Sequence, residues 1–133
     1  MIKMEDDITA KRDELLLKGL GFEANREEEK AIKQYLLAAE LGSIEARFNI
    51  ARLYLRKSLL EKSNQIWATK SYEHFCSLYA NAPMQSIDGL FLLWQNNRNN
   101  PLGTSILQFI ADKANNVDEY AQKRLQKIKE ILK

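Results

Sequence analysis

Few side chains in this 133-residue sequence have the chemistry of a catalytic group. His74 is the only histidine and Cys76 the only cysteine, and they lie two positions apart. A thiol and an imidazole can act as nucleophile and base, but residues i and i+2 of a helix point in different directions. A zinc site would need further ligands close by. We therefore interpret Cys76 as a small core residue and His74 as a partly exposed one.

The acidic run Glu27-Glu28-Glu29 is a second candidate, as a patch for a metal ion. The same run suits the first turn of a helix, where the helix dipole favours negative charge, and we adopt that interpretation. Gly19-Leu20-Gly21 follows no strand and lacks the Lys-Ser/Thr sequel of a phosphate-binding loop. We expect no catalytic residue, no metal site and no cofactor, and therefore a protein that is not an enzyme.

The most regular feature of the chain is a pattern that returns every 37 residues without gaps. A fixed period in this range is typical of stacked helical repeats, which usually hold other molecules rather than transform them. In one register a leucine recurs, and in another a small residue precedes an aromatic residue by four positions. These registers contain Leu16, Leu53 and Leu90, and the pairs Ala31/Tyr35, Ala68/Tyr72 and Ser105/Phe109.

The composition favours helices, since good helix formers dominate and Val117 is the only valine. Two close glycines at Gly19-Leu20-Gly21 predict a helix break. Asn25 and Ser43 are the expected N-caps of the next two helices, and Gly42 is an expected stop. We predict one domain over residues 1–133, with repeats at about 6–42, 43–82 and 83–114 and a polar capping helix at 117–132. The seven predicted helices are roughly Asp6–Lys18, Arg26–Leu41, Ile44–Lys57, Asn64–Tyr79, Met84–Asn96, Leu102–Ala114 and Val117–Leu132.

The segment from Lys30 to Tyr54 resembles a Sel-one-like repeat, a relative of the tetratricopeptide repeat. In that family a Lys-Ala pair opens the second helix, Ala-Ala-Glu closes it and a glycine turn follows, as in Lys30-Ala31, Ala38-Ala39-Glu40 and Gly42. Ala51 stands where the family usually has glycine. The motif match covers residues 19–54 and fades afterwards. The resemblance implies an all-α, tetratricopeptide-like right-handed superhelix of three helical hairpins plus a C-terminal capping helix, whose concave side holds a protein or peptide.

In repeats of this family the first helix of each hairpin lines the concave face. Arg52 and Arg56, one turn apart, would clamp a carboxylate there, and Phe48 would supply apolar contact. Alternatively, Arg47, Arg52 and Arg56 form an ordinary solvated helix face. The 37-residue register also places Gly89 in the row of Arg52. The residues that we expect to contact a partner are Lys11, Lys18, Phe48, Arg52, Arg56 and Gln85.

The charge of the chain is unevenly distributed. Residues 1–45 carry 11 acids and 7 bases, whereas residues 46–100 carry 3 acids and 7 bases. This asymmetry favours an acidic protein or peptide partner and is too weak to indicate nucleic acid. We expect no membrane span, because no apolar run is long enough, and no secretory signal, because residues 1–7 contain no apolar segment. The lone cysteine suits a reducing compartment, so we expect a cytoplasmic protein.

These observations predict a non-enzymatic module for protein–protein interaction. An alternative is a small bacterial immunity or inhibitor protein that neutralises a cognate toxin or effector. A third hypothesis is an enzyme or a small-molecule carrier whose cavity is lined by Trp and Tyr residues. Trp67 and Trp94 are candidates for this lining, because each lies off the main apolar stripe of its helix. A fourth, concerning the fold alone, is an irregular helical bundle in which the 37-residue register is coincidental.

Overall fold

The structure is a computed structural model that describes the backbone of residues 2–133 and the side chains from Asp6 onward. Over this range it is all-helical, with seven α-helices and no strand, which confirms the predicted class and the number of helices. None of the described helices is both long enough and apolar enough to cross a bilayer. The helices are α1 (Ile2–Ala24), α2 (Glu28–Glu40), α3 (Ile44–Leu60), α4 (Gln65–Leu78), α5 (Pro83–Gln95), α6 (Pro101–Asn115) and α7 (Glu119–Leu132).

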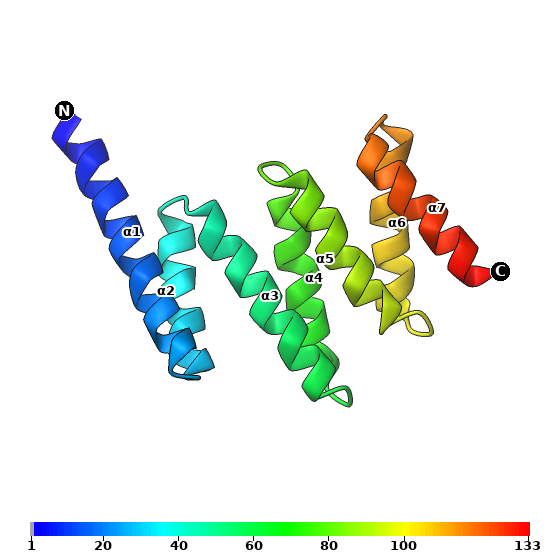
Figure 1. Cartoon of the computed structure of the whole chain (residues 1–133), viewed down its shortest axis with the longest axis horizontal. Helices are drawn as coiled ribbons and strands as arrows, with labels where there is room; N and C mark the ends of the chain where they lie inside the picture. The colour runs from blue at the N-terminus through cyan, green and yellow to red at the C-terminus, as the bar shows by residue number, and fades with distance from the viewer. Residues whose placement is uncertain (1) are drawn as a thin grey trace.

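The helices follow one another in an antiparallel zigzag, with the two termini at opposite ends of the molecule (Figure 1). We call the side formed by α1, α3, α5 and α7 the front face, and the side formed by α2, α4 and α6 the rear face. Each helix packs against its neighbours in the chain. On the front face α3 also contacts α5, and α5 also contacts α7. Side chains of alternate helices are therefore brought together across the front of the molecule.

The predicted break at Gly19-Leu20-Gly21 is wrong, because α1 continues through both glycines to Ala24. Gly19 is needed for close packing rather than for a turn. A Cβ at this position would lie 2.4 Å from Cε1 of Tyr35, whose ring is fully buried on α2. The chain reverses instead at Arg26, whose φ of 62° lies in the left-handed region.

The N-caps are only partly as predicted. The Ser43 hydroxyl accepts a hydrogen bond from the Ala46 N–H at 3.0 Å, which confirms Ser43 as the cap of α3. Asn25 does not cap α2, because the helix begins at Glu28 after a turn and Glu27 makes no side-chain cap bond. The last helix begins two residues later than predicted, since Val117 has a φ of 70° and Asp118 caps α7.

The buried apolar side chains form two clusters. The smaller one lies among α1, α2 and α3 and includes Tyr35 and Ile50. The larger one extends from α3 to α7 and includes Phe75, Phe91 and Trp94. This burial contradicts a role for Trp94 in lining a ligand cavity.

Candidate functional site

A hollow of about 250 Å³ opens on the front face between α3 and α5. We call it the front hollow. Its wall is largely apolar, and it brings together three residues that the sequence singled out, Phe48, Arg52 and Gln85. Residues from α3, α4 and α5 complete it. The lining residues are Phe48, Arg52, Leu55, Phe75, Gln85, Asp88, Gly89 and Leu92.

The front hollow depends on Gly89, which lies inside α5. A Cβ here would lie 2.2 Å from Cε1 of Phe75, so only glycine lets the ring of α4 pack directly on the α5 backbone. Glycine inside a helix costs roughly 0.5–1 kcal/mol relative to alanine, and the close helix packing offsets this cost. Leu92 is 50% exposed beside the hollow, so apolar surface there faces solvent.

The basic group that lines the front hollow is already paired. The Arg52 guanidinium lies 2.8 and 2.9 Å from the two oxygens of Glu23 on α1, and the Tyr35 hydroxyl donates to the same carboxylate at 2.7 Å. Burial alone would raise the pKa of Glu23, but the hydrogen bonds from Tyr35 and Arg52 outweigh it and hold this pKa below its usual value. Arg52 therefore ties α3 to the end of α1.

The acidic group that lines the front hollow is paired in the same way. Asp88 accepts hydrogen bonds from the Tyr120 hydroxyl at 2.6 Å and from Nε of Arg124 at 2.9 Å, both on α7. The hydrogen bond with Tyr120 and the nearby Asp88 carboxylate raise the pKa of Arg124 despite partial burial. Both charged residues of the front hollow are thus neutralised by this chain's own side chains.

The other predicted contact residues lie outside the front hollow. Arg56 forms an ion pair with Glu28 of α2. Lys11 and Lys18 both lie on α1, each 3.5 Å from an oxygen of Glu14. The six residues therefore do not form one surface, and only Phe48, Arg52 and Gln85 share a hollow.

Cys76 and His74 have different surroundings. Cys76 packs against the larger core, and burial raises the pKa of its thiol to about 11, which disfavours the nucleophilic thiolate. His74 stacks on Tyr54, with ring centroids 5.7 Å apart. Burial lowers the pKa of His74, and among the charged neighbours Glu73 opposes this shift whereas Lys70 and Arg47 add to it.

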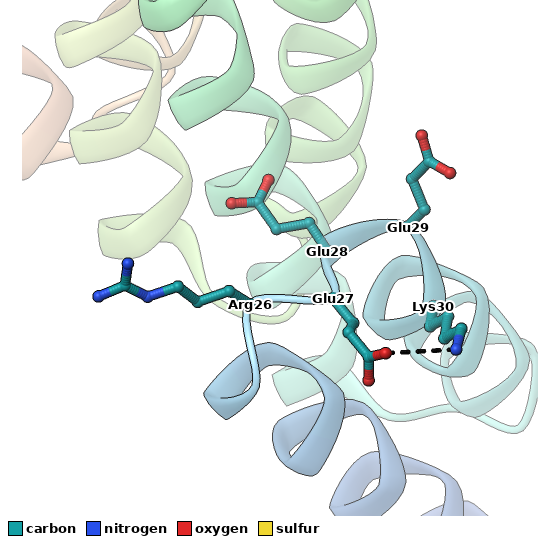
Figure 2. Close-up of a pocket in the computed structure, with 5 residues that line it drawn as sticks. All are labelled: Arg26, Glu27, Glu28, Glu29 and Lys30. Carbon is teal, nitrogen blue, oxygen red and sulfur yellow. Dashed lines mark hydrogen bonds and ion pairs between the residues drawn. The ribbon is translucent and has the colours of Figure 1, made fainter.

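The acidic run lies in the turn and first helical residues between α1 and α2, and its carboxylates diverge (Figure 2). Glu27 accepts from the Lys30 ammonium at 3.3 Å, and Glu28 pairs with Arg56. Glu29 points away from both, as Figure 2 shows. Among the residues with described side chains, no three carboxylate, imidazole or thiol groups are placed to hold a metal ion.

Sequence reasoning missed two important residues of the front hollow. Phe75 belongs to a rear helix, and its approach to Gly89 depends on the packing of α4 against α5. Asp88 faces α7, and no local pattern indicates its bonds to residues 32 and 36 positions away. Gly89, by contrast, follows from the 37-residue register, which places it in the row of Arg52. Comparison with family models, curated proteins and solved structures finds no match.

Proposed function

We propose that this chain is a non-enzymatic protein-interaction module that binds a protein partner through the front hollow. The observation that carries the proposal is an open apolar hollow whose charged lining residues are both paired internally. Binding a charged group there would compete with existing ion pairs, and burying a charge without a partner is costly. The anchor that fits is an uncharged apolar side chain protruding from the partner.

The lining of the front hollow favours an apolar side chain over a polar small ligand. Sites for small molecules combine apolar walls with a few polar groups that fix the orientation of the ligand. Both charged groups of the front hollow already have partners on this chain, and Leu92 is exposed beside it. Protein interfaces often concentrate their binding energy in one anchor that fills such a hollow, surrounded by contacts that exclude water.

The repeat architecture supports the same proposal. Under the Sel-one-like resemblance, the front face is the concave side of a right-handed superhelix built from hairpins α1–α2, α3–α4 and α5–α6, with α7 as the cap. On the front face α5 contacts both α3 and α7, and on the rear face α4 contacts α6, so alternate helices lie close together as in stacked hairpins. Such a surface would surround the anchor residue with further contacts from Phe48 and Gln85, both of which line the front hollow.

A matched pair of leucine variants tests this function. Leu92→Glu places a charge beside the front hollow, whereas Leu17→Glu makes the same change on α1, where the leucine is 67% exposed. Both sites face solvent, so we expect both variants to fold. In affinity capture from native cell extract, a partner held by the wild type should be absent with Leu92→Glu and kept with Leu17→Glu. A partner that survives Leu92→Glu would contradict the proposed surface, and loss of a captured partner's own activity on binding would assign the chain to the inhibitor class.

A further inference from the structure

A second hollow, also of about 250 Å³, is formed by α2, α3 and α4. We call it the rear hollow. Its lining differs from that of the front hollow, because it combines aromatic rings with two lysines. It shares no residue with the front hollow. The lining residues are Glu29, Ile32, Tyr54, Lys57, Trp67 and Lys70.

The aromatic wall of the rear hollow is a stack of rings. Tyr54 of α3 lies between two rings of α4, with Trp67 at 5.8 Å and His74 at 5.7 Å between centroids. The indole Nε1–H of Trp67 donates to Glu61 at 2.5 Å, which fixes the edge of that ring. This stack provides a flat aromatic wall.

Both ammonium groups of the rear hollow lie against this wall. Nζ of Lys57 is 4.7 Å from the centroid of Trp67. Nζ of Lys70 is 5.5 Å from the centroid of Tyr54 and 5.7 Å from that of Trp67. Cation–π contact holds an ammonium in place without cancelling its charge, since a neutral ring carries no net charge.

Neither lysine of the rear hollow forms an ion pair with any side chain that the structure describes. Other lysines that lie over rings do have such partners. Lys30 covers Phe22 and pairs with Glu27. Lys113 covers Tyr79 and pairs with Asp112. Two ammonium groups beside one ring, neither in an ion pair with a described side chain, leave hydrogen-bond donors and positive charge available at the rear hollow.

We propose that the rear hollow binds a phosphate-type oxyanion between Lys57 and Lys70, with Trp67 and Ile32 forming apolar walls for the group that carries it. Lysine binds phosphate oxygens as a point charge. Two carboxylates oppose an anion here, because Glu29 lines the same hollow and Glu61 accepts the hydrogen bond of the Trp67 indole. The apolar walls favour an organic phosphate ester over the free ion. This inference is independent of the front hollow and of the function proposed there.

The experiment follows the two indole N–H signals in the NMR spectrum of ¹⁵N-labelled full-length protein at constant ionic strength. The Trp67 signal, assigned with Trp67→Phe, should shift and saturate on titration with inorganic phosphate and with phenyl phosphate. The Trp94 signal should stay in place, because Trp94 is buried in the core. Tighter binding of the phenyl ester assigns the rear hollow to a phosphate ester, and equal affinities assign it to the free ion.

Charge variants decide whether the lysines are responsible. Lys70→Gln should weaken binding roughly tenfold, because it removes one of two charged donors, and Glu29→Gln should tighten binding. Lys33→Gln removes an exposed lysine of α2 that does not line the rear hollow, and should leave the affinity unchanged. A shift that does not saturate, equal shifts of both indoles, or equal weakening by Lys70→Gln and Lys33→Gln would overturn the proposal.

Discussion

Replacing each glycine of α1 by alanine should have opposite effects on stability. Alanine inside a helix is favoured over glycine by roughly 0.5–1 kcal/mol. Gly21→Ala should stabilise the protein by about that amount, because a Cβ there meets no atom within 4 Å. At Gly19 the same gain is opposed by the ring of Tyr35.

The size of this opposition follows from the structure. A Cβ on Gly19 would lie 2.4 Å from Cε1 of Tyr35, against about 3.4 Å for an ordinary contact, so the ring would have to move by about 1 Å. Tyr35 is fully buried and its hydroxyl is held by Glu23, so such a movement disturbs the core. Overpacking of this kind costs roughly 1–3 kcal/mol. The helix gain is the same at both positions, so Gly19→Ala should be less stable than Gly21→Ala by roughly 1–3 kcal/mol.

Urea denaturation and thermal melting measure this difference directly. For a chain of this length it corresponds to about 3–5 °C in Tm per kcal/mol. In a Tyr35→Ala background the penalty at Gly19 should disappear, because the ring is gone. A stabilising Gly19→Ala in the wild-type background would refute the contact with Tyr35. A destabilising Gly21→Ala would refute the continuous α1 and would support the helix break that the sequence predicts at this position.

Three further outcomes follow from the ion pairs and the titrating groups. Arg52→Met should lower the free energy of unfolding by about 1 kcal/mol, because Glu23 loses its charged partner. Arg56→Met should lower it by less, because this variant breaks a more exposed ion pair. Equal effects of the two variants in urea denaturation would contradict this expectation. The free energy of unfolding should fall between pH 7.5 and 5.5, because the unfolded imidazole of His74 binds a proton near its usual pKa while burial lowers the pKa of the folded one. His74→Phe should reduce that fall, and an unchanged pH dependence in this variant would show that His74 does not cause it. The Cys76 thiol, with a pKa of about 11, should react with a disulfide reagent at pH 8 at least about tenfold faster after denaturation than before; equal rates would show that the native thiol is accessible.

The helices could be predicted where local chemistry and tertiary packing agree. Ser43 caps α3 as expected. Helices α5 and α6 begin at Pro83 and Pro101, each one residue before its predicted start. The end of α1 could not be predicted, because glycine has two uses that look alike in a sequence. At Gly19 it allows Tyr35 to approach rather than the chain to turn, and only the packing of α1 against α2 distinguishes the two.

Only part of the front hollow could be predicted from the sequence. Phe48, Arg52 and Gln85, three of the six expected contact residues, lie on the front helices α3 and α5 and line one hollow. The register carries no information about which carboxylate lies opposite a given arginine. Arg52 pairs with Glu23, 29 positions earlier on another helix, and this pairing depends on how α1 and α3 each pack against α2.

The basic residues of the segment 46–100 differ in whether they have a carboxylate partner. Arg52 and Arg56, the two arginines expected to clamp a carboxylate, both have carboxylate partners on this chain. Lys57 and Lys70, from the same segment, have none among the described residues and lie beside one ring. An acidic ligand therefore fits the rear hollow better than the front one.

Salt should separate the two hollows, because ion pairing at a surface is screened by salt whereas apolar burial is not. Anion binding at the rear hollow should weaken as the salt concentration rises, while binding of the protein partner at the front hollow should persist. The same salt series, run on Leu92→Glu and Lys70→Gln, assigns each binding event to its surface. Salt-sensitive binding that Leu92→Glu abolishes and Lys70→Gln leaves intact would contradict this division.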